Sequence, residues 1–275
     1  SALFLLLLAP EFYAPLRQLG ADYHVKAQAE GAIAELSPLL AFQPAENTKA
    51  NHFLLTAPPA IDANNIWVNH QQRIRLAPLS FAIAAGERFA IVGQSRSGKS
   101  TLLQIFLGFC AYQGDIFIDN QNFNTINSTQ FRHQIAYLSQ QTMLLPMSIA
   151  DNLRLPNPTA SDDKLWQILA QVGLKPLIKA LPNQLETQLG ERGSGLSGGQ
   201  QRRLAIAQLL LQDAQLWLLD EPTEHLDSDT AAEINALLQQ VTRGKTVLWV
   251  THDATNLPWL DRQISLDIAS TLAKA

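Results

Sequence analysis

The chain has 275 residues, of which 47% are hydrophobic and 16% charged, and its 24 acidic and 20 basic side chains give a net charge of −4. This length allows one large domain or two smaller ones, each with a sizeable core. The acidic balance argues against a nucleic-acid partner, which would need a basic surface. The single cysteine, Cys110, excludes an internal disulfide framework.

The first residues, SALFLLLLAPEFYAPLRQLG, form an apolar run that ends in proline and charged residues. The run from Ala2 to Ala9 is shorter than the roughly 20 apolar residues that cross a bilayer. It also lacks the basic flank and the cleavage site of a signal peptide. Two interpretations remain, a buried helix or the end of a longer apolar segment, and we expect the second because residue 1 is Ser rather than Met.

Further along the chain, Tyr23–Leu40 is rich in alanine and is predicted to be a helix. The polar, proline-containing residues 43–60 are predicted to be a linker. The strands predicted after the linker are Ile66–Val68, Leu79–Ile83, Arg88–Val92, Gly114–Ile118, Ile135–Leu138, Gln215–Leu219 and Thr246–Val250. The predicted helices between them are Lys99–Leu107, Asp162–Val172, Ser197–Leu211 and Thr230–Gln240. This alternation predicts an α/β fold with a mostly parallel sheet that is covered on both faces.

The segment RFAIVGQSRSGKST places a glycine-rich loop between a predicted strand and a predicted helix. It matches the pattern GxxxxGK[ST], in which glycines let main-chain N–H groups surround a phosphate and the lysine adds a positive charge. The residues predicted to bind phosphate are Gly93, Gln94, Ser95, Arg96, Ser97, Gly98, Lys99, Ser100 and Thr101. The Ser100 hydroxyl is in addition a predicted ligand of Mg²⁺.

The segment QLWLLDEPT places two carboxylates directly after an apolar strand. The carboxyl end of a central parallel strand faces the crevice in which such folds bind their ligands. Asp220 is therefore predicted to ligate Mg²⁺. Glu221 is predicted to orient or deprotonate an attacking water.

The segment LSGGQQRRLAIAQLLL lies between these two motifs. A serine at a helix start with adjacent glycines can form an anion site. In this order the segment resembles the signature of ABC-type ATPases, carried here by Ser197, Gly198, Gly199 and Gln200. Three more residues match elements of that family: Gln140 its Q-loop glutamine, Asp227 its D-loop, and His252 its switch histidine.

The chain is thus identified as a member of the ABC ATPase family. This resemblance implies a P-loop NTPase fold of ABC type over residues 61–275, with a mostly parallel core sheet, an antiparallel β subdomain and a helical subdomain at about residues 141–212. It implies ATP and Mg²⁺ as cofactors, and Glu221, His252, Lys99 and Gln140 as catalytic residues, with Gln140 also contacting the metal. It further implies a head-to-tail dimer, in which Ser197 and Gly199 act on the nucleotide held by the partner.

Two positions depart from the family's pattern. Arg96 stands where the family usually has glycine; if φ must be positive there, arginine would cost on the order of 1 kcal/mol. We favour the alternative that Arg96 tolerates the local geometry and points to solvent. His70 stands where the adenine-stacking tyrosine usually lies, because Ile66, Val68 and His70 share one face of a strand. Trp67 is the alternative ring.

The region before the linker, LLLLAPEFYAPLRQLGADYHVKAQAEGAIAEL, resembles that of the CydD subunits of bacterial cysteine/glutathione exporters. The segments GFCAYQGDIFIDN and APLSFAIAAGERFAIVG are similar to the same family. This resemblance implies that residues 1–42 contain the cytoplasmic end of the last transmembrane helix and the helix that follows it. It implies a CydC-like partner half-transporter and a place at the bacterial inner membrane, with the ATPase domain on the cytoplasmic side.

The implied function is ATP-driven export of a thiol reductant, cysteine or glutathione, to the periplasm, in support of cytochrome bd assembly. The resemblance implies that the small thiol binds outside these 275 residues. Alternatives are an exporter half for lipid, drug or peptide substrates, a non-transport ABC ATPase, and a nucleotide-gated regulatory module without turnover. The presence of Glu221 disfavours the last.

Other conspicuous side chains are predicted to be structural. Trp217 and Trp249 lie in predicted central strands and are expected in the core. Arg202 and Arg203 are expected on a solvated helix face or at the rim of a dimer.

Overall fold

The structure, a computed structural model, describes residues 2–41, 53–70, 73–253 and 257–266. The chain divides into two compact units, Ser1–Thr48 and Lys49–Ala275. Residues 43–52 of the predicted linker lie outside the described ranges, and residues 53–60 contain no helix or strand.

The described part of the first unit is one helix, α1 (Ala2–Ala41). The predicted helix Tyr23–Leu40 is confirmed, but α1 begins far earlier because the leucine- and alanine-rich start has high helix propensity and the prolines do not end it. Large apolar side chains along α1 are exposed: Phe12, Leu16, Leu19, Tyr23, Ile33 and Leu40. No helix in the described ranges is long and apolar enough to cross a membrane.

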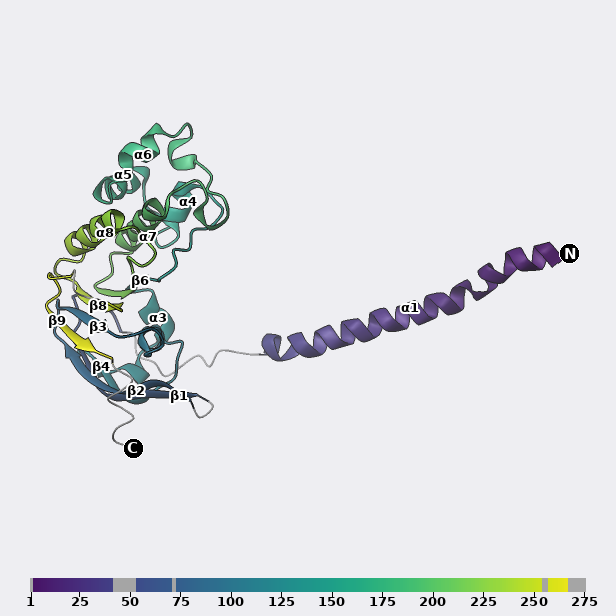
Figure 1. Cartoon of the computed structure of the whole chain (residues 1–275), viewed down its shortest axis with the longest axis horizontal. Helices are drawn as coiled ribbons and strands as arrows, with labels where there is room; N and C mark the ends of the chain where they lie inside the picture. Colours follow the sequence, from purple (N-terminus) through teal and green to yellow (C-terminus); the bar gives the residue numbers. More distant parts are fainter. Residues whose placement is uncertain (1, 42–52, 71–72, 254–256, 267–275) are drawn as a thin grey trace. The chain divides into compact units, whose positions relative to one another are not determined.

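The second unit (Figure 1) is built around a five-stranded sheet. Its strand order is β6-β7-β8-β3-β9, and every neighbouring pair is parallel. Its strands are β3 (Arg88–Val92), β6 (Ile135–Leu138), β7 (Leu216–Asp220), β8 (Thr246–Thr251) and β9 (Arg262–Ser265). Every residue of β7 and β8 is buried. Continuous apolar runs of this kind are typical of parallel strands covered on both faces.

A second sheet is antiparallel and has the order β2-β1-β4-β5. Its strands are β1 (Ile61–His70), β2 (Arg73–Ile83), β4 (Gln113–Ile118) and β5 (Gln121–Asn122). Irregular register around Asn65, which has φ +49°, interrupts β1. This irregularity breaks the alternation of apolar residues, so the sequence pattern predicted only Ile66–Val68 of the strand.

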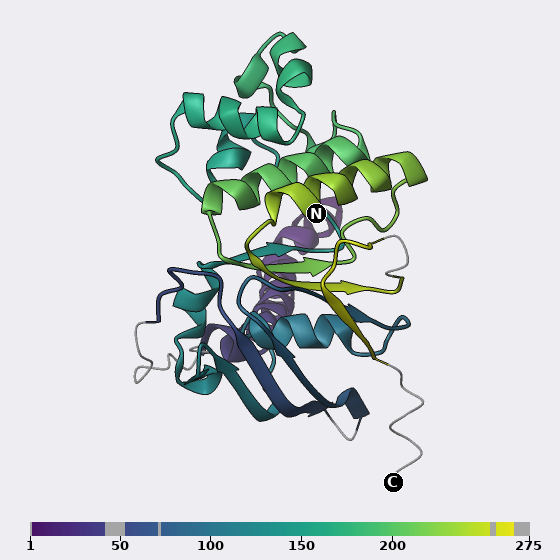
Figure 2. The same cartoon turned by 90° about the vertical axis from the view of Figure 1, so that its left-hand side faces the viewer.

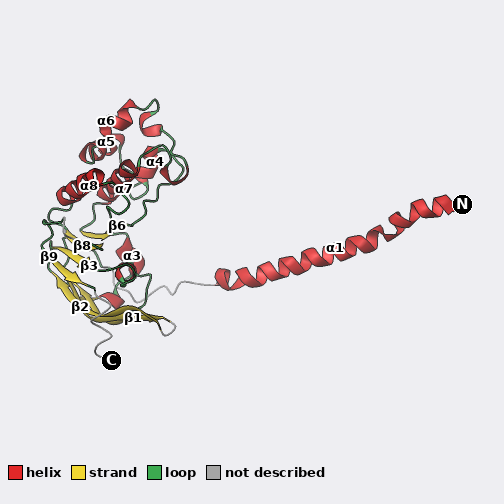
Figure 3. Ribbon diagram, in the orientation of Figure 1, coloured by secondary structure: helices red, strands yellow, loops and turns green. Residues whose placement is uncertain are grey.

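Helices cover both faces of the parallel sheet (Figures 2 and 3). They are α2 (Lys99–Phe106), α3 (Ser128–Arg132), α4 (Ile149–Arg154), α5 (Asp162–Gln171), α6 (Lys175–Ala180), α7 (Gly198–Gln212) and α8 (Ser228–Val241). Short 3₁₀ turns are Phe123–Thr125, Gln184–Glu186 and Glu191–Gly193. Helices α4 to α6 form the helical subdomain beside α7.

Alternate residues of the parallel sheet face two separate cores. Trp217, Leu219 and Trp249 belong to a core with α7 and α8. Leu218 and Leu248 belong to the other, with α2 and the antiparallel sheet. Both tryptophans are 1% exposed, which confirms their prediction as core residues, and the predicted fold class is confirmed as well.

Candidate active site

The glycine-rich loop between β3 and α2 is wrapped around the side chain of Lys99. Its ammonium donates to the carbonyl oxygens of Gly93 (2.6 Å) and Gln94 (3.0 Å), and the residue is only 5% exposed. At Gly98, φ is +103° and an added Cβ would lie 2.7 Å from the Arg75 carbonyl oxygen. A glycine is therefore required at this point for the chain to turn into α2.

Two features of this loop fit a phosphate group. The Ser97 hydroxyl is buried and has no hydrogen-bond partner within the described residues. Helix α2 begins at Lys99 with no side-chain cap, so its first main-chain N–H groups are left for a ligand. A phosphate would satisfy these donors, and Lys99 would supply a positive charge.

Arg96 does adopt the left-handed conformation, with φ +70°, and its side chain is exposed. The favoured expectation had two parts: the side chain points to solvent, which is confirmed, and Arg96 tolerates the local geometry, which stays a prediction. The backbone nevertheless has the positive φ that glycine adopts at little cost.

Two of the three predicted metal ligands, Ser100 and Asp220, come from different motifs and lie together. The Ser100 hydroxyl is hydrogen-bonded to Asp220 at the end of β7. Burial and the adjacent charge of Glu221 raise the pKa of Asp220 to about 6, although Ser100 and Lys99 act in the opposite direction. Tyr137 of β6 is hydrogen-bonded to Asp220 as well, and burial together with the Asp220 charge raises the pKa of Tyr137 to about 12. A hydroxyl paired with a buried carboxylate is a donor set that suits Mg²⁺.

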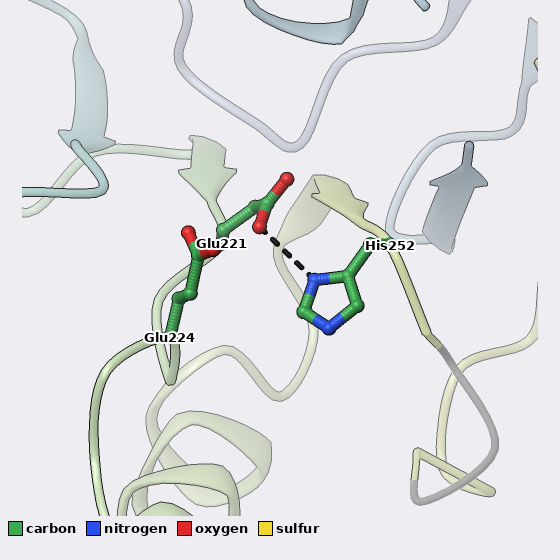
Figure 4. Close-up of side chains that lie close together, drawn as sticks. All are labelled: Glu221, Glu224 and His252. Atoms are coloured by element: carbon green, nitrogen blue, oxygen red, sulfur yellow. Dashed lines mark hydrogen bonds and ion pairs between the residues drawn. The ribbon is translucent and has the colours of Figure 1, made fainter. Parts of the chain in front are cut away.

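Glu221 lies between Lys99 and His252. Its carboxylate is 3.3 Å from the Lys99 ammonium through Oε1 and 3.1 Å from His252 Nδ1 through Oε2 (Figure 4). Burial opposes ionisation of Glu221, but hydrogen bonds with His252 and Glu224 and the charge of Lys99 outweigh it and lower the pKa. Glu221 is therefore ionised at neutral pH, and it has the strained φ of +43° that is common among functional residues.

The Q-loop glutamine is held by two residues that the sequence analysis did not assign to the site. Its side-chain Nε2 donates to the carboxylate of Glu224. Arg202 of α7 donates to the main-chain carbonyl oxygens of Ser139 and Gln140. The expected solvated position of Arg202 is wrong: the residue is 3% exposed, and burial lowers the pKa of its guanidinium.

The signature residues lie at the amino end of α7. Ser197 and Gln200 form a capping box, in which each side chain bonds the other's main-chain N–H. An added Cβ on Gly199 would lie 2.5 Å from Thr230 Cγ2, and one on Gly198 would lie 3.6 Å from Leu226. The signature is therefore adjacent to the D-loop, where Asp227 caps α8 by accepting from the Thr230 N–H.

The adenine-stacking residue remains a prediction. His70 ends β1, and its side chain lies outside the described residues. Ile66 and Val68 are both buried, as their predicted common face requires, and Trp67 is half-buried.

The fold and these contacts define a P-loop nucleotide-binding domain whose phosphate loop, strand-end carboxylates and histidine meet at one edge of a parallel sheet. Residues 76–224, more than half of the chain, match the family model described as "ABC transporter". The chain belongs to the ABC transporter family, and it contains the family's ATP-binding domain.

Several transport proteins are similar to this chain over most of its length. The chain is 35% identical over 254 residues to the glutathione/L-cysteine transport system ATP-binding/permease protein CydD of Escherichia coli, covering 92% of this chain and 43% of that protein. It is 35% identical over 249 residues to the transport ATP-binding protein AarD of Providencia stuartii, covering 90% and 42%. To CydC of Escherichia coli it is 41% identical over 198 residues, covering 72% and 34%.

The solved structure of a bacterial Atm1-family ABC exporter with ATP bound is 29% identical, with a TM-score of 0.78 over 94% of this chain and 46% of that one. The chain thus spans less than half the length of these relatives.

Proposed function

We propose that this chain is the ATP-hydrolysing part of an ABC exporter half that moves a small thiol, cysteine or glutathione, out of the cytoplasm. The observation that carries the hydrolytic assignment is the meeting of Lys99, Ser100, Asp220, Glu221 and His252 at the ends of β3, β7 and β8. The thiol assignment rests on the similarity to CydD and CydC proteins.

Each of these side chains has a distinct role in the proposed reaction. Lys99 neutralises charge on the terminal phosphates, and the main-chain N–H groups of the loop bind the same oxygens. Ser100 and Asp220 would hold Mg²⁺, which supplies further positive charge against the phosphate oxygens. Glu221 is ionised and accepts the hydrogen bond of an attacking water, orienting it for in-line attack. His252 holds the Glu221 carboxylate by its second oxygen.

We further propose that catalysis requires a second ATPase domain arranged head to tail. The signature glycines lie against Leu226 and Thr230, at the D-loop and the start of α8, and the signature of this family is expected to act on the nucleotide held by a partner domain. They would therefore complete a site on a partner, for which a CydC-like half is our candidate.

Residues 1–42 are assigned to the membrane domain of the exporter half, residues 43–60 to a linker and residues 61–275 to the ATPase. The exposed apolar side chains along α1 support this assignment, because an isolated helix in water would not keep such a surface uncovered. The exporter would lie in the bacterial inner membrane, with the ATPase domain on its cytoplasmic side.

The test uses the full-length parent protein, co-expressed with its partner half, in inside-out vesicles. We expect ATP-dependent uptake of labelled cysteine or glutathione, and loss of that uptake in Glu221→Gln, which keeps the size of the side chain but removes its charge. Intact ATP hydrolysis without thiol uptake would refute the substrate and leave the ATPase assignment standing. An unchanged hydrolysis rate in Glu221→Gln would refute the role given to Glu221.

A further inference from the structure

Glu224 is a carboxylate at the centre of the candidate site with no role in the proposed reaction. It lies in the turn that follows β7, where its N–H donates to the Glu221 carbonyl oxygen (3.0 Å). Single side-chain atoms of Glu221, Glu224 and His252 lie within 4.8 Å of one another (Figure 4). Glu221 and His225 have positive φ values of +43° and +63°, so the shape of this turn is sharply specified.

The main chain of Gln140 is fixed independently of Glu224. The buried guanidinium of Arg202 donates to two successive carbonyl oxygens, those of Ser139 and Gln140. Arginine presents its donors in a rigid planar fork, so a pair of carbonyls held in this way has little freedom to shift. What remains free at Gln140 is its exposed side chain and, above all, the direction of its amide.

Glu224 removes that remaining freedom. In the structure the Gln140 amide faces Glu224 with its NH₂ group, and a carboxyl oxygen of Glu224 accepts the hydrogen bond. The amide oxygen is then the end of the side chain left to accept a hydrogen bond or to ligate a metal. Without Glu224 the amide could turn over at little cost, because its nitrogen and oxygen are nearly equal in size.

We propose that Glu224 is a positioning residue that holds the Gln140 side chain with Oε1 available to the Mg²⁺–nucleotide. This inference rests on the proposed function, in which Gln140 contacts the metal. A ligand fixed by a hydrogen-bond partner typically loses about 10–100-fold in metal affinity when that partner is removed. Glu224 therefore acts through Gln140 and not on the nucleotide itself.

The test is a double-mutant cycle on metal binding in the 275-residue chain. Mn²⁺ affinity is measured by electron paramagnetic resonance with a non-hydrolysable ATP analogue bound, so the measurement does not depend on turnover. The proteins are the unaltered chain, Glu224→Ala, Gln140→Ala and the double variant. Glu224→Gln is a variant of equal size that can both donate and accept, and Glu186→Ala, which removes an exposed glutamate of the helical subdomain, is the control.

We expect Mn²⁺ to bind about tenfold more weakly to Glu224→Ala and to Gln140→Ala, and no more weakly to the double variant than to either single variant. Glu224→Gln is expected to fall between the unaltered chain and Glu224→Ala, and Glu186→Ala to match the unaltered chain. Unchanged affinity in Glu224→Ala, or losses that add in the double variant, would overturn the inference while leaving the proposed function intact. Absence of nucleotide-dependent Mn²⁺ binding in the unaltered chain would refute the proposed function itself.

Discussion

The positive φ of Arg96 in the phosphate loop predicts how a glycine at this position would change the stability of the folded chain. Arg96 has φ +70° and an exposed side chain. An L-residue in the left-handed region costs roughly 1–2 kcal/mol. Glycine avoids this cost, but it adds about 0.4–1 kcal/mol of unfolded-state entropy. Arg96→Gly should therefore stabilise the folded state by about 1 kcal/mol, and in a domain of this size that raises Tm by about 2–4 °C.

The matched control is Arg96→Ala, which removes the same exposed side chain but keeps the strained φ. Its stability should stay within about 0.5 kcal/mol of the unaltered chain. Unfolding in urea or by heat can be followed by tryptophan fluorescence, because all five tryptophans belong to the unit that carries the loop. If the glycine variant were no more stable than the alanine variant, the positive φ would not be the source of the strain, and the reasoning would fail.

Two further predictions concern the framework around the site. Asp261 accepts hydrogen bonds from the main chain and side chain of Arg88, and the Arg88 side chain is the main cause that lowers the pKa of Asp261. A lowered folded-state pKa means that the stabilisation is present above the unfolded pKa and is lost as pH falls through the folded one. Asp261→Asn should therefore lower the urea midpoint at pH 7, and the difference from the unaltered chain should shrink below about pH 4; a constant difference would contradict the ion-pair explanation. Arg202→Lys should cost about 1–3 kcal/mol in free energy of unfolding, because one ammonium cannot bridge both carbonyls as the fork does. Arg243 is exposed, so Arg243→Lys is the control. An equal loss of unfolding free energy in that variant would contradict the explanation by the two hydrogen bonds of the Arg202 guanidinium.

The elements that sequence patterns predicted well carry a strong apolar signal: β3 after its first residue and β6 are continuous apolar runs, and the buried residues of α5 lie on one helix face. Strands Arg88–Val92 and Ile135–Leu138 have the predicted bounds, and α5 and α7 lie within a residue of theirs. The strand β9 was not predicted because its residues are mostly exposed and carry no apolar alternation. The short helices α3, α4 and α6 were not predicted either, because they are shorter than the window over which a helical period becomes visible.

Sequence patterns are local, and this also explains which site residues could be predicted from the sequence. Lys99, Asp220 and Glu221 stand in local motifs with a definite strand context, so their types and spacing predict their place. Glu224 and Arg202 act on main-chain or side-chain atoms of the Q-loop, which is far away in the sequence. One signal was present: Arg202 precedes the buried Ala205 and Ile206 by three and four residues, which puts it on the buried face of α7.

The segment from Glu221 to Asp227 joins the groups on which the proposed reaction depends. Glu221, at its start, contacts Lys99 of the phosphate loop, and Glu224 binds the side chain of Gln140. Asp227, at its end, caps α8 beside the signature glycines. Glu221 and His225 have positive φ values, so the turns within this short segment are sharply specified. In the proposed head-to-tail arrangement, a partner at the signature would press on the end of this segment at Asp227, while the proposed water-orienting Glu221 and the residue that binds Gln140 belong to the same segment.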